Sequence, residues 1–345
     1  MTRSVLSIGI VGLPNVGKST LFKILTKQDI TIANYPFATI DPNVGIVSVP
    51  DERLEQLNAL SKSKKKIPAV VEFYDIAGLV KGANKGEGLG NQFLGHIKET
   101  QAITIVLRVF QNADIIHVEN SVDPMRDLEI INSELILKDL ELVEKRFSKA
   151  EAEARTGKKE AIQDKELIGR IKARLESGKL PVADPHLLRD YFHYVATTGR
   201  LNDVNLLTFK RQIYLLNGEP SDVPAALIEK IKSLGADHLV INLAAAESVP
   251  ELVREAYKIL NLISFFTTGE DETRAWTIEQ GTKAPQAAGV IHTDFEKKFI
   301  RLEVVSTAKL LEAGSWAAAK QKGWLRVEGK DYVVQDGDVL EVRHG

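Results

Sequence analysis

A nine-residue segment near the start of the chain carries the strongest chemical signal. The segment G-L-P-N-V-G-K-S-T, residues 12–20, matches G-x-x-x-x-G-K-[ST], a loop whose backbone N–H groups surround phosphate oxygens. The alternative is an ordinary strand-to-helix turn, but an apolar strand precedes the motif and a helix-like segment follows it, which favours a phosphate loop. We expect the nucleotide to be bound by these residues of the loop: Asn15, Val16, Gly17, Lys18, Ser19 and Thr20.

Individual roles can be assigned within this loop and in a second motif. Lys18 should reach the β- and γ-phosphates and support catalysis, and Ser19 should ligate Mg²⁺. Asp75 ends the apolar run V-V-E-F-Y and forms D-x-x-G with Gly78, which predicts a carboxylate near Mg²⁺ and an amide that senses the γ-phosphate. The glycine-rich tail that follows, residues 79–90, predicts a mobile switch, with a plain flexible loop as the alternative.

Hydrolysis needs a group that orients water, and here the pattern departs from many related enzymes. Leu79 follows the D-x-x-G motif where such hydrolases often keep a glutamine. Because leucine forms no hydrogen bond, another side chain, the backbone or a bound cation must position the water. Thr39 is a candidate second Mg²⁺ ligand or else a turn residue, and His96 is the nearest imidazole, although a single histidine at a helix start is more often structural.

The elements that must position these groups follow an α/β pattern. Short β-branched apolar runs alternate with turn-rich and helical segments over the first third, as in a mostly parallel sheet buried on both faces. From about Met125 the sequence becomes charged and helix-favouring, with Leu135, Leu142 and Phe147 at helical spacing and a break near residues 156–157. This predicts an inserted hairpin of two antiparallel helices, whose alternative interpretation is a solvated arm without a partner.

Strand texture resumes after the arm and changes again near the end of the chain. We expect a discontinuous nucleotide-binding domain over 1–124 and 190–262, a helical arm over 125–189, and a small β-rich module over 263–345. The 345 residues hold 45 Lys plus Arg against 47 Asp plus Glu and no cysteine, so disulfides and thiolate metal sites are excluded. With no long apolar run and no leader-like start, we expect a cytoplasmic protein without a membrane or DNA partner.

Several blocks of the sequence together resemble a known family. The blocks N-Y-P-F-A-T-I-D-P-N-V-G, D-I-A-G-L-V-K-G-A-N-K-G-E-G-L-G-N-Q-F-L, A-P-Q-A-A-G-V-I-H-T-D-F-E-K-K-F-I-R and G-K-D-Y-V-V-Q-D-G-D-V are similar to those of the YchF or Obg-like ATPases. The likeness spans nearly the whole chain. It implies a P-loop NTPase domain of the G type, an inserted coiled-coil arm and a C-terminal TGS domain, which is a ubiquitin-like β-grasp module.

The resemblance also bears on the base and on the missing catalytic glutamine. Guanine-specific relatives use N-K-x-D, whereas the Obg-like branch is similar to N-x-x-E and tends to prefer ATP; here Asn217, Gly218 and Glu219 are followed by Pro220 in the fourth position. This favours ATP with GTP as a possible second substrate, unless the segment is only a turn. The segment N-L-A-A-A-E, residues 242–247, resembles the part that closes over the base.

Two further family roles concern the water and a second cation. Relatives carry a hydrophobic residue at the position of Leu79 and often a histidine on the next strand, where this chain has Ile105. Related enzymes use an asparagine equivalent to Asn15 to help hold K⁺ beside the phosphates, and bracing of the loop is the alternative role. Mg²⁺ is therefore the expected cofactor and K⁺ a candidate.

The family's link to translation suggests the partner. Lys297, Lys298 and Arg301 in the C-terminal module could meet RNA phosphates, or they could belong to a solvated strand edge. We expect a slow Mg²⁺-dependent ATPase that switches with nucleotide state and associates with the ribosome or its RNA. The alternatives are a GTPase of ribosome assembly and a nucleotide-gated RNA or protein adaptor with negligible hydrolysis.

Overall fold

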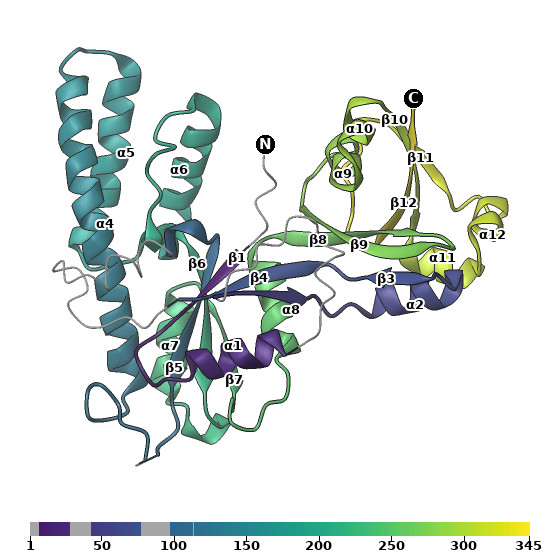
Figure 1. Ribbon diagram of the computed structural model, residues 1–345. Coiled ribbons are helices and arrows are strands. Elements are labelled where there is room, and N and C mark those ends of the chain that lie inside the picture. The colour runs from purple at the N-terminus through teal and green to yellow at the C-terminus, as the bar shows by residue number, and fades with distance from the viewer. Residues whose placement is uncertain (1–6, 28–42, 77–96, 113) are drawn as a thin grey trace. The chain divides into compact units, whose positions relative to one another are not determined.

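The computed structural model describes residues 7–27, 43–76, 97–112 and 114–345 (Figure 1). Contacts between residues divide the chain into two compact units. The first comprises Met1–Leu25, Asp41–Gly45 and Phe73–Ser248, and the second comprises Thr26–Ile40, Ile46–Glu72 and Val249–Gly345. Each unit is described by itself.

A mostly parallel sheet forms the framework of the first unit, and parts of its strands β2 and β4 belong to the second unit in the division above. Its strand order is β2-β4-β1-β5-β6-β7, and the pairs β1–β5, β5–β6 and β6–β7 are parallel. Every residue of β1 and β5 is buried, as expected for strands covered on both faces. The strands span β1 Ser7–Val11, β2 Val44–Ser48, β4 Val70–Asp75, β5 Ala102–Arg108, β6 Arg211–Asn217 and β7 Asp237–Ile241. The apolar runs of the sequence thus predicted these strands correctly.

Helices connect the strands of this sheet and build the arm. The helix α1 (Lys18–Thr26) follows β1, and α7 (Ala225–Ser233) separates β6 from β7. The arm rises on α4 (Pro124–Ala154), which lies beside α5 (Lys159–Glu176) in Figure 1. The predicted break at residues 156–157 falls between these two helices.

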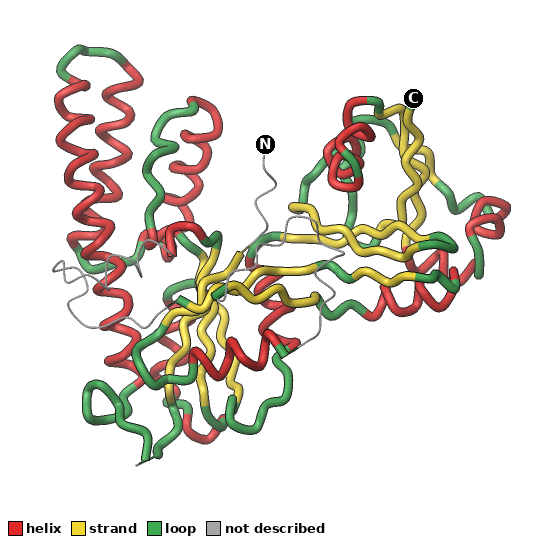
Figure 2. The backbone as a smooth tube through the Cα atoms, viewed as in Figure 1, coloured by secondary structure: helices red, strands yellow, loops and turns green. Residues whose placement is uncertain are grey.

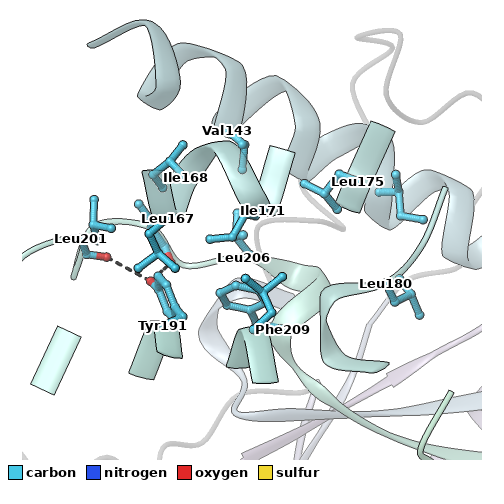
Figure 3. Close-up of a cluster of buried hydrophobic side chains, with 13 residues drawn as sticks. Val143, Leu167, Ile168, Ile171, Leu175, Leu180, Tyr191, Leu201, Leu206 and Phe209 are labelled. Atoms are coloured by element: carbon cyan, nitrogen blue, oxygen red, sulfur yellow. Dashed lines mark hydrogen bonds between the residues drawn. The ribbon is translucent and has the colours of Figure 1, made fainter. Parts of the chain in front are cut away.

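A separate hydrophobic cluster holds the arm together (Figure 3). Val143 of α4 and Ile168 and Ile171 of α5 are fully buried in it. The cluster continues into α6 (Pro185–Thr198) and the segment up to Phe209, so the apolar core of the arm extends past residue 189. The hydroxyl of Tyr191 lies 2.7 Å from the carbonyl oxygen of Val204, which ties α6 to this segment. The arm is therefore a helical subdomain with a packed apolar core and charged outer faces.

The second unit contains a β-grasp-like sheet that includes residues from the first third of the chain. Its strand order is β11-β10-β12-β8-β9-β3. Figure 2 draws the strands of the chain in yellow and the helices in red. The pairs β8–β9, β10–β11 and β10–β12 are antiparallel, whereas β12–β8 and β3–β9 are parallel. The strands span β3 Lys65–Ile67, β8 Leu262–Thr268, β9 Glu272–Glu279, β10 Phe299–Ser306, β11 Arg326–Glu328 and β12 Asp338–His344.

Short helices complete this unit. They are α2 Glu52–Ser61, α8 Pro250–Ile259, α9 Ala284–Ile291, α10 Thr293–Lys297, α11 Thr307–Ala313 and α12 Trp316–Gln321. In α2, Arg53 donates from Nη1 to Oδ2 of Asp336 at 2.6 Å. The segment around α2 and β3 thus packs with the C-terminal module, a grouping that the sequence did not indicate.

The fold class predicted from sequence is confirmed: an α/β nucleotide-binding domain, an inserted helical arm and a C-terminal β-grasp module. The domain boundaries stay predictions. Within the described part of the chain, no helix is long and apolar enough to cross a membrane.

Candidate functional site

The predicted phosphate loop lies between β1 and α1 and has the backbone conformation that such a loop needs. Asn15 and Gly17 have φ angles of 62° and 110°, in the region that glycine adopts most easily. A Cβ atom added at Gly17 would lie 2.5 Å from Nδ2 of Asn217. A glycine is therefore required at this position both by backbone conformation and by close packing.

Lys18 begins α1 and points its ammonium group back over the loop. Its Nζ donates to the carbonyl oxygen of Leu13 at 2.7 Å, and only 8% of the residue is exposed. Burial lowers the pKa of Lys18 to about 8, although the nearby carboxylate of Asp75 opposes this shift. Burial likewise raises the pKa of Asp75, and the charge of Lys18 counteracts it. The two groups predicted from separate motifs are thus electrostatically coupled.

The donor groups at this end of the loop suit Mg²⁺. The exposed Ser19 lines the adjoining pocket, and Asp75 at the end of β4 is partly buried and within electrostatic reach of Lys18. A hydroxyl, one carboxylate, phosphate oxygens and waters make the oxygen-rich set that Mg²⁺ prefers. The other predicted ligand, Thr39, lies outside the described residues.

A pocket of about 500 Å³ adjoins the phosphate loop. Its size is within the range of about 300–1,000 Å³ that is usual for ligand sites. The lining residues come from four segments of the first unit, namely Asn15, Gly17, Lys18, Ser19, Thr20; Phe110, Asn112, Ile115; Asn217, Gly218, Glu219, Asp222; and Asn242, Leu243, Ala244. The structure thus brings together the phosphate loop and the predicted base segments.

Asn217 joins the phosphate loop to the base segments. Its Nδ2 donates to the carbonyl oxygen of Val16 at 2.9 Å, and its Oδ1 accepts from the backbone N–H of Leu243 at 3.1 Å. The residue is 5% exposed. One amide hydrogen and one lone pair remain for a ligand, so Asn217 can brace the pocket and contact a base at the same time.

The carboxylates of the base segment are already engaged by the chain. Oε1 of Glu219 accepts from Nδ2 of Asn242 at 2.7 Å, and Oδ2 of Asp222 accepts from the backbone N–H of Glu219 at 3.1 Å. The backbone N–H of Ala244 in turn donates to Oδ1 of Asn242 at 3.0 Å. These bonds fix the shape of the pocket edge, although neither Glu219 nor Asp222 occupies the fourth position of an N-K-x-D motif.

The loop after β5 forms a wall of the pocket that the sequence did not reveal. Arg108, the last residue of β5, is 1% exposed and donates to the carbonyl oxygens of Phe110, Asn112 and Ile115 at 2.9–3.2 Å. Its guanidinium also lies 4.5 Å from the centre of the Phe110 ring. A single buried arginine thus holds in place the three residues of this loop that line the pocket. A lone arginine at a strand end gave no signal of this role.

The same loop connects the phosphate loop to the base of the arm. Nδ2 of Asn15 donates to the carbonyl oxygen of Ile116 at 3.0 Å. The next residue, His117, is buried, and its Nε2 lies 2.8 Å from Oδ2 of Asp127 in the first turn of α4. Nδ1 of His117 accepts from the backbone N–H of Glu119, so Nε2 carries the proton toward the carboxylate.

Replacing His117 by alanine should lower the affinity for ATP by about fivefold, because it leaves the buried Asp127 without one partner and loosens the wall of the pocket. Calorimetric titration would measure the affinity for ATP, and thermal unfolding would measure the effect of leaving Asp127 without this partner. His186 on α6 is exposed, so His186→Ala serves as the matched control. An unchanged affinity in His117→Ala would show that this loop does not shape the pocket.

The pKa of Lys18 predicts a pH dependence. A lysine with a pKa of about 8 loses its charge as the pH rises through that value, and a triphosphate binds the charged form. ATP affinity should therefore be full below about pH 7 and should fall by up to about tenfold per pH unit above about pH 8. Calorimetry over this range would test the slope. In Lys18→Arg the charge persists, so the slope should vanish; a wild-type slope of zero would contradict the assignment.

The predicted catalytic groups other than Lys18 cannot be placed. Thr39, Gly78 and His96 lie outside the described residues, as does Leu79. Ile105 is fully buried in β5, paired with Val11 and Tyr214, so it offers no group to a water molecule. Among the described residues that line the pocket there is no histidine.

The predicted RNA-binding residues lie in the second unit. Lys297 ends α10, Lys298 follows it, and Arg301 is in β10; all three are exposed. Because they are exposed, these residues can contact a polyanion, but their exposure does not indicate which polyanion binds.

Known proteins are similar to this chain over almost its full length. Residues 7–143 match a family model described as "50S ribosome-binding GTPase", and residues 262–345 match the model YchF-GTPase_C, described as "Protein of unknown function (DUF933)". The Ribosome-binding ATPase YchF of Bacillus subtilis is 43% identical over 98% of this chain and 99% of its own length. The Obg-like ATPase 1 of Oryza sativa is 42% identical over 97% and 91%. The solved structure of the Schizosaccharomyces pombe YchF GTPase superposes with a TM-score of 0.85 at 38% identity, covering 98% of this chain and 97% of that one.

Proposed function

Because the chain belongs to the family of the YchF and Obg-like ATPases, we propose that it is a Mg²⁺-dependent ATPase that acts as a nucleotide-state switch and associates with the ribosome. The observation that supports this most directly is the pocket itself. It joins a lysine-bearing phosphate loop to a base segment that lacks the guanine-selecting carboxylate in its usual place.

The described residues provide binding and charge neutralisation. Backbone N–H groups of the loop and the ammonium of Lys18 hold the β- and γ-phosphates. Lys18 donates one N–H to the carbonyl oxygen of Leu13, so its other two remain for phosphate oxygens. Ser19 and Asp75 would hold Mg²⁺, which when bound neutralises charge on the transferring phosphoryl group. Phe110 and Leu243 lie on the pocket wall, where an aromatic and an aliphatic side chain can cover the faces of a purine.

We expect slow turnover by the chain alone, because the part of the pocket that the structure describes offers no evident water-orienting group. Leu79 and Ile105 cannot hydrogen-bond to water, and the ring nitrogens of His117 are both engaged. A partner that supplies or aligns this group should accelerate hydrolysis, as arginine-finger systems do by about 10³–10⁵. We propose the ribosome as that partner, with the arm and the exposed residues Lys297, Lys298 and Arg301 available to its RNA. K⁺ held near Asn15 is a second proposed cofactor.

The decisive experiment is single-turnover phosphate release from ATP, with Mg²⁺ and either K⁺ or Na⁺, in the presence and absence of ribosomes. The proposal expects slow release alone and faster release with ribosomes. Release that is absent in every condition would instead support a nucleotide-gated adaptor without hydrolysis.

A GTPase of ribosome assembly is the second candidate, because the pocket edge also carries the carboxylate of Asp222. Competition between unlabelled ATP and GTP for a labelled ATP analogue separates the two. If GTP displaces the analogue far better than ATP does, the ATPase proposal is wrong.

A further inference from the structure

A groove of about 700 Å³ lies in the second unit. It shares no lining residue with the nucleotide pocket. Its walls come from the end of α2, the β8–β9 hairpin, β12 and the α9–α12 helices. Its lining residues are Leu60, Ser61, Thr267, Thr268, Gly269, Glu270, Glu272, Trp276, Ile291, Phe295, Leu310, Gly314, Ser315, Trp316 and Val339, Leu340, Glu341, Val342.

The groove runs along the edge of a strand. Successive side chains of a strand point to opposite faces of a sheet, yet four consecutive residues of β12, Val339 to Val342, all line it. The strands β8 and β12 pair at one position only, Val339 with Phe266. They diverge in Figure 1. From Leu340 onward, β12 is paired with β10 on one side and, among the described residues, with no strand on the other. The groove therefore lies where β8 and β12 separate from each other.

Such an opening suits an extended peptide. A strand edge presents unpaired N–H and C=O groups, and a bound peptide can satisfy them by joining the sheet. Peptides that bind in this way place alternate side chains in pockets on either side of the backbone. Val339 and Leu340 are buried, whereas Glu341 and Val342, one from each face of β12, are partly exposed. Both sets of peptide side chains would therefore find a contact beside the outer part of the strand.

The chemistry of the lining favours a cationic peptide. Three carboxylates, Glu270, Glu272 and Glu341, and two tryptophans line the groove, and its described lining contains no lysine, arginine or histidine. Two of these carboxylates already pair with arginines of the chain, because Glu341 lies 3.0 Å from Arg343 and Glu272 lies 3.9 Å from Arg274. Glu270 is exposed and remains for a cation from outside. Carboxylates and the faces of indole rings both attract guanidinium and ammonium groups.

The chain itself illustrates this binding mode at the rim. Arg274 lies 4.0 Å from the centre of the Trp276 ring and 3.9 Å from Glu272. A guanidinium thus already rests between an indole face and a carboxylate. Trp316 offers a further ring and Glu270 a further carboxylate to cations from outside.

From these observations we propose that the groove binds an extended, arginine- or lysine-bearing peptide segment of a partner protein, paired through its backbone with the free edge of β12. The groove lies within the second unit, and peptide binding there does not depend on nucleotide hydrolysis. Single-stranded RNA could stack on the rings, but its phosphates would approach the carboxylate of Glu270, and the nearby Arg274 and Arg343 are already paired with carboxylates of the chain.

Tryptophan fluorescence of the full chain gives a direct test, because two of its three tryptophans line the groove and Trp324 does not. In the variant Trp324→Phe, the signal comes from the groove. The probe is a short capped peptide that alternates arginine with valine; the matched peptides carry glutamate in place of arginine, or N-methyl groups that prevent pairing with β12. The arginine peptide should bind at least about tenfold more tightly than either.

Charge removal inside the groove provides the second arm. Glu270→Gln should weaken the arginine peptide by about tenfold, whereas Glu312→Gln, on α11 outside the groove, should not. The proposal is overturned if the arginine peptide fails to bind, if the glutamate peptide binds equally well, or if Glu270→Gln binds the arginine peptide unchanged. Quenching by oligouridine that the arginine peptide cannot displace would assign the groove to RNA instead.

Discussion

Lys18→Ala should weaken the binding of ATP by about 100-fold or more and reduce phosphate release at least as much, while the protein remains folded. Lys18 is the cationic side chain among the described residues that line the pocket. Because it is buried, its contact with a phosphate is stronger than the same contact in water. Isothermal titration with ATP and Mg²⁺ measures the affinity. Far-UV circular dichroism checks the fold.

The matched control for this experiment lies on the same helix. Lys23 is exposed in α1 and does not line the pocket, so Lys23→Ala should leave ATP affinity unchanged. If Lys18→Ala binds ATP as tightly as the natural chain, the phosphate-loop assignment fails. A loss of affinity in both variants would point to a general effect of helix charge.

Asn217→Ala is expected to reduce ATP affinity by about 30-fold and to destabilise the first unit by about 2–4 kcal/mol. The side chain is buried and satisfies the carbonyl oxygen of Val16 and the N–H of Leu243, so its removal leaves two buried polar groups without partners. It also frees the phosphate loop from the base segments. Denaturant unfolding and calorimetric titration would separate the two effects.

Two comparisons make this prediction specific. Asn202→Ala removes an exposed amide that bonds to Gly199, and it should change neither quantity. Asn217→Asp keeps an acceptor for Leu243 but loses the donor to Val16, so it should weaken ATP binding nearly as much as alanine does. A stable Asn217→Ala variant with full affinity would show that Asn217 is not the brace described above.

Local sequence was sufficient to predict the loop between β1 and α1. The phosphate loop is a continuous segment whose function resides mainly in its own backbone, so Gly17, Lys18 and Ser19 were recognisable from their spacing. The buried strands were predictable for a related reason, since a strand covered on both faces must be apolar throughout. Asp75 was found because it directly follows such a strand.

Other parts of the site depend on side-chain bonds that leave no pattern in the sequence. Arg108 and His117 shape the pocket through bonds to backbone carbonyls and to Asp127, and such bonds place no constraint on neighbouring sequence. The dual bonding of Asn217 likewise joins residues about 200 positions apart.

The sequence by itself determined the fold class, the phosphate loop and the existence of the arm, because each of these is written in a periodic or contiguous pattern. Only the tertiary structure decided that residues around α2 and β3 join the C-terminal sheet and that β12 keeps a free edge beside a carboxylate-lined groove. The physical reason is that strand pairing and pocket walls are set by backbone hydrogen bonds and packing between remote segments, which many different side chains allow.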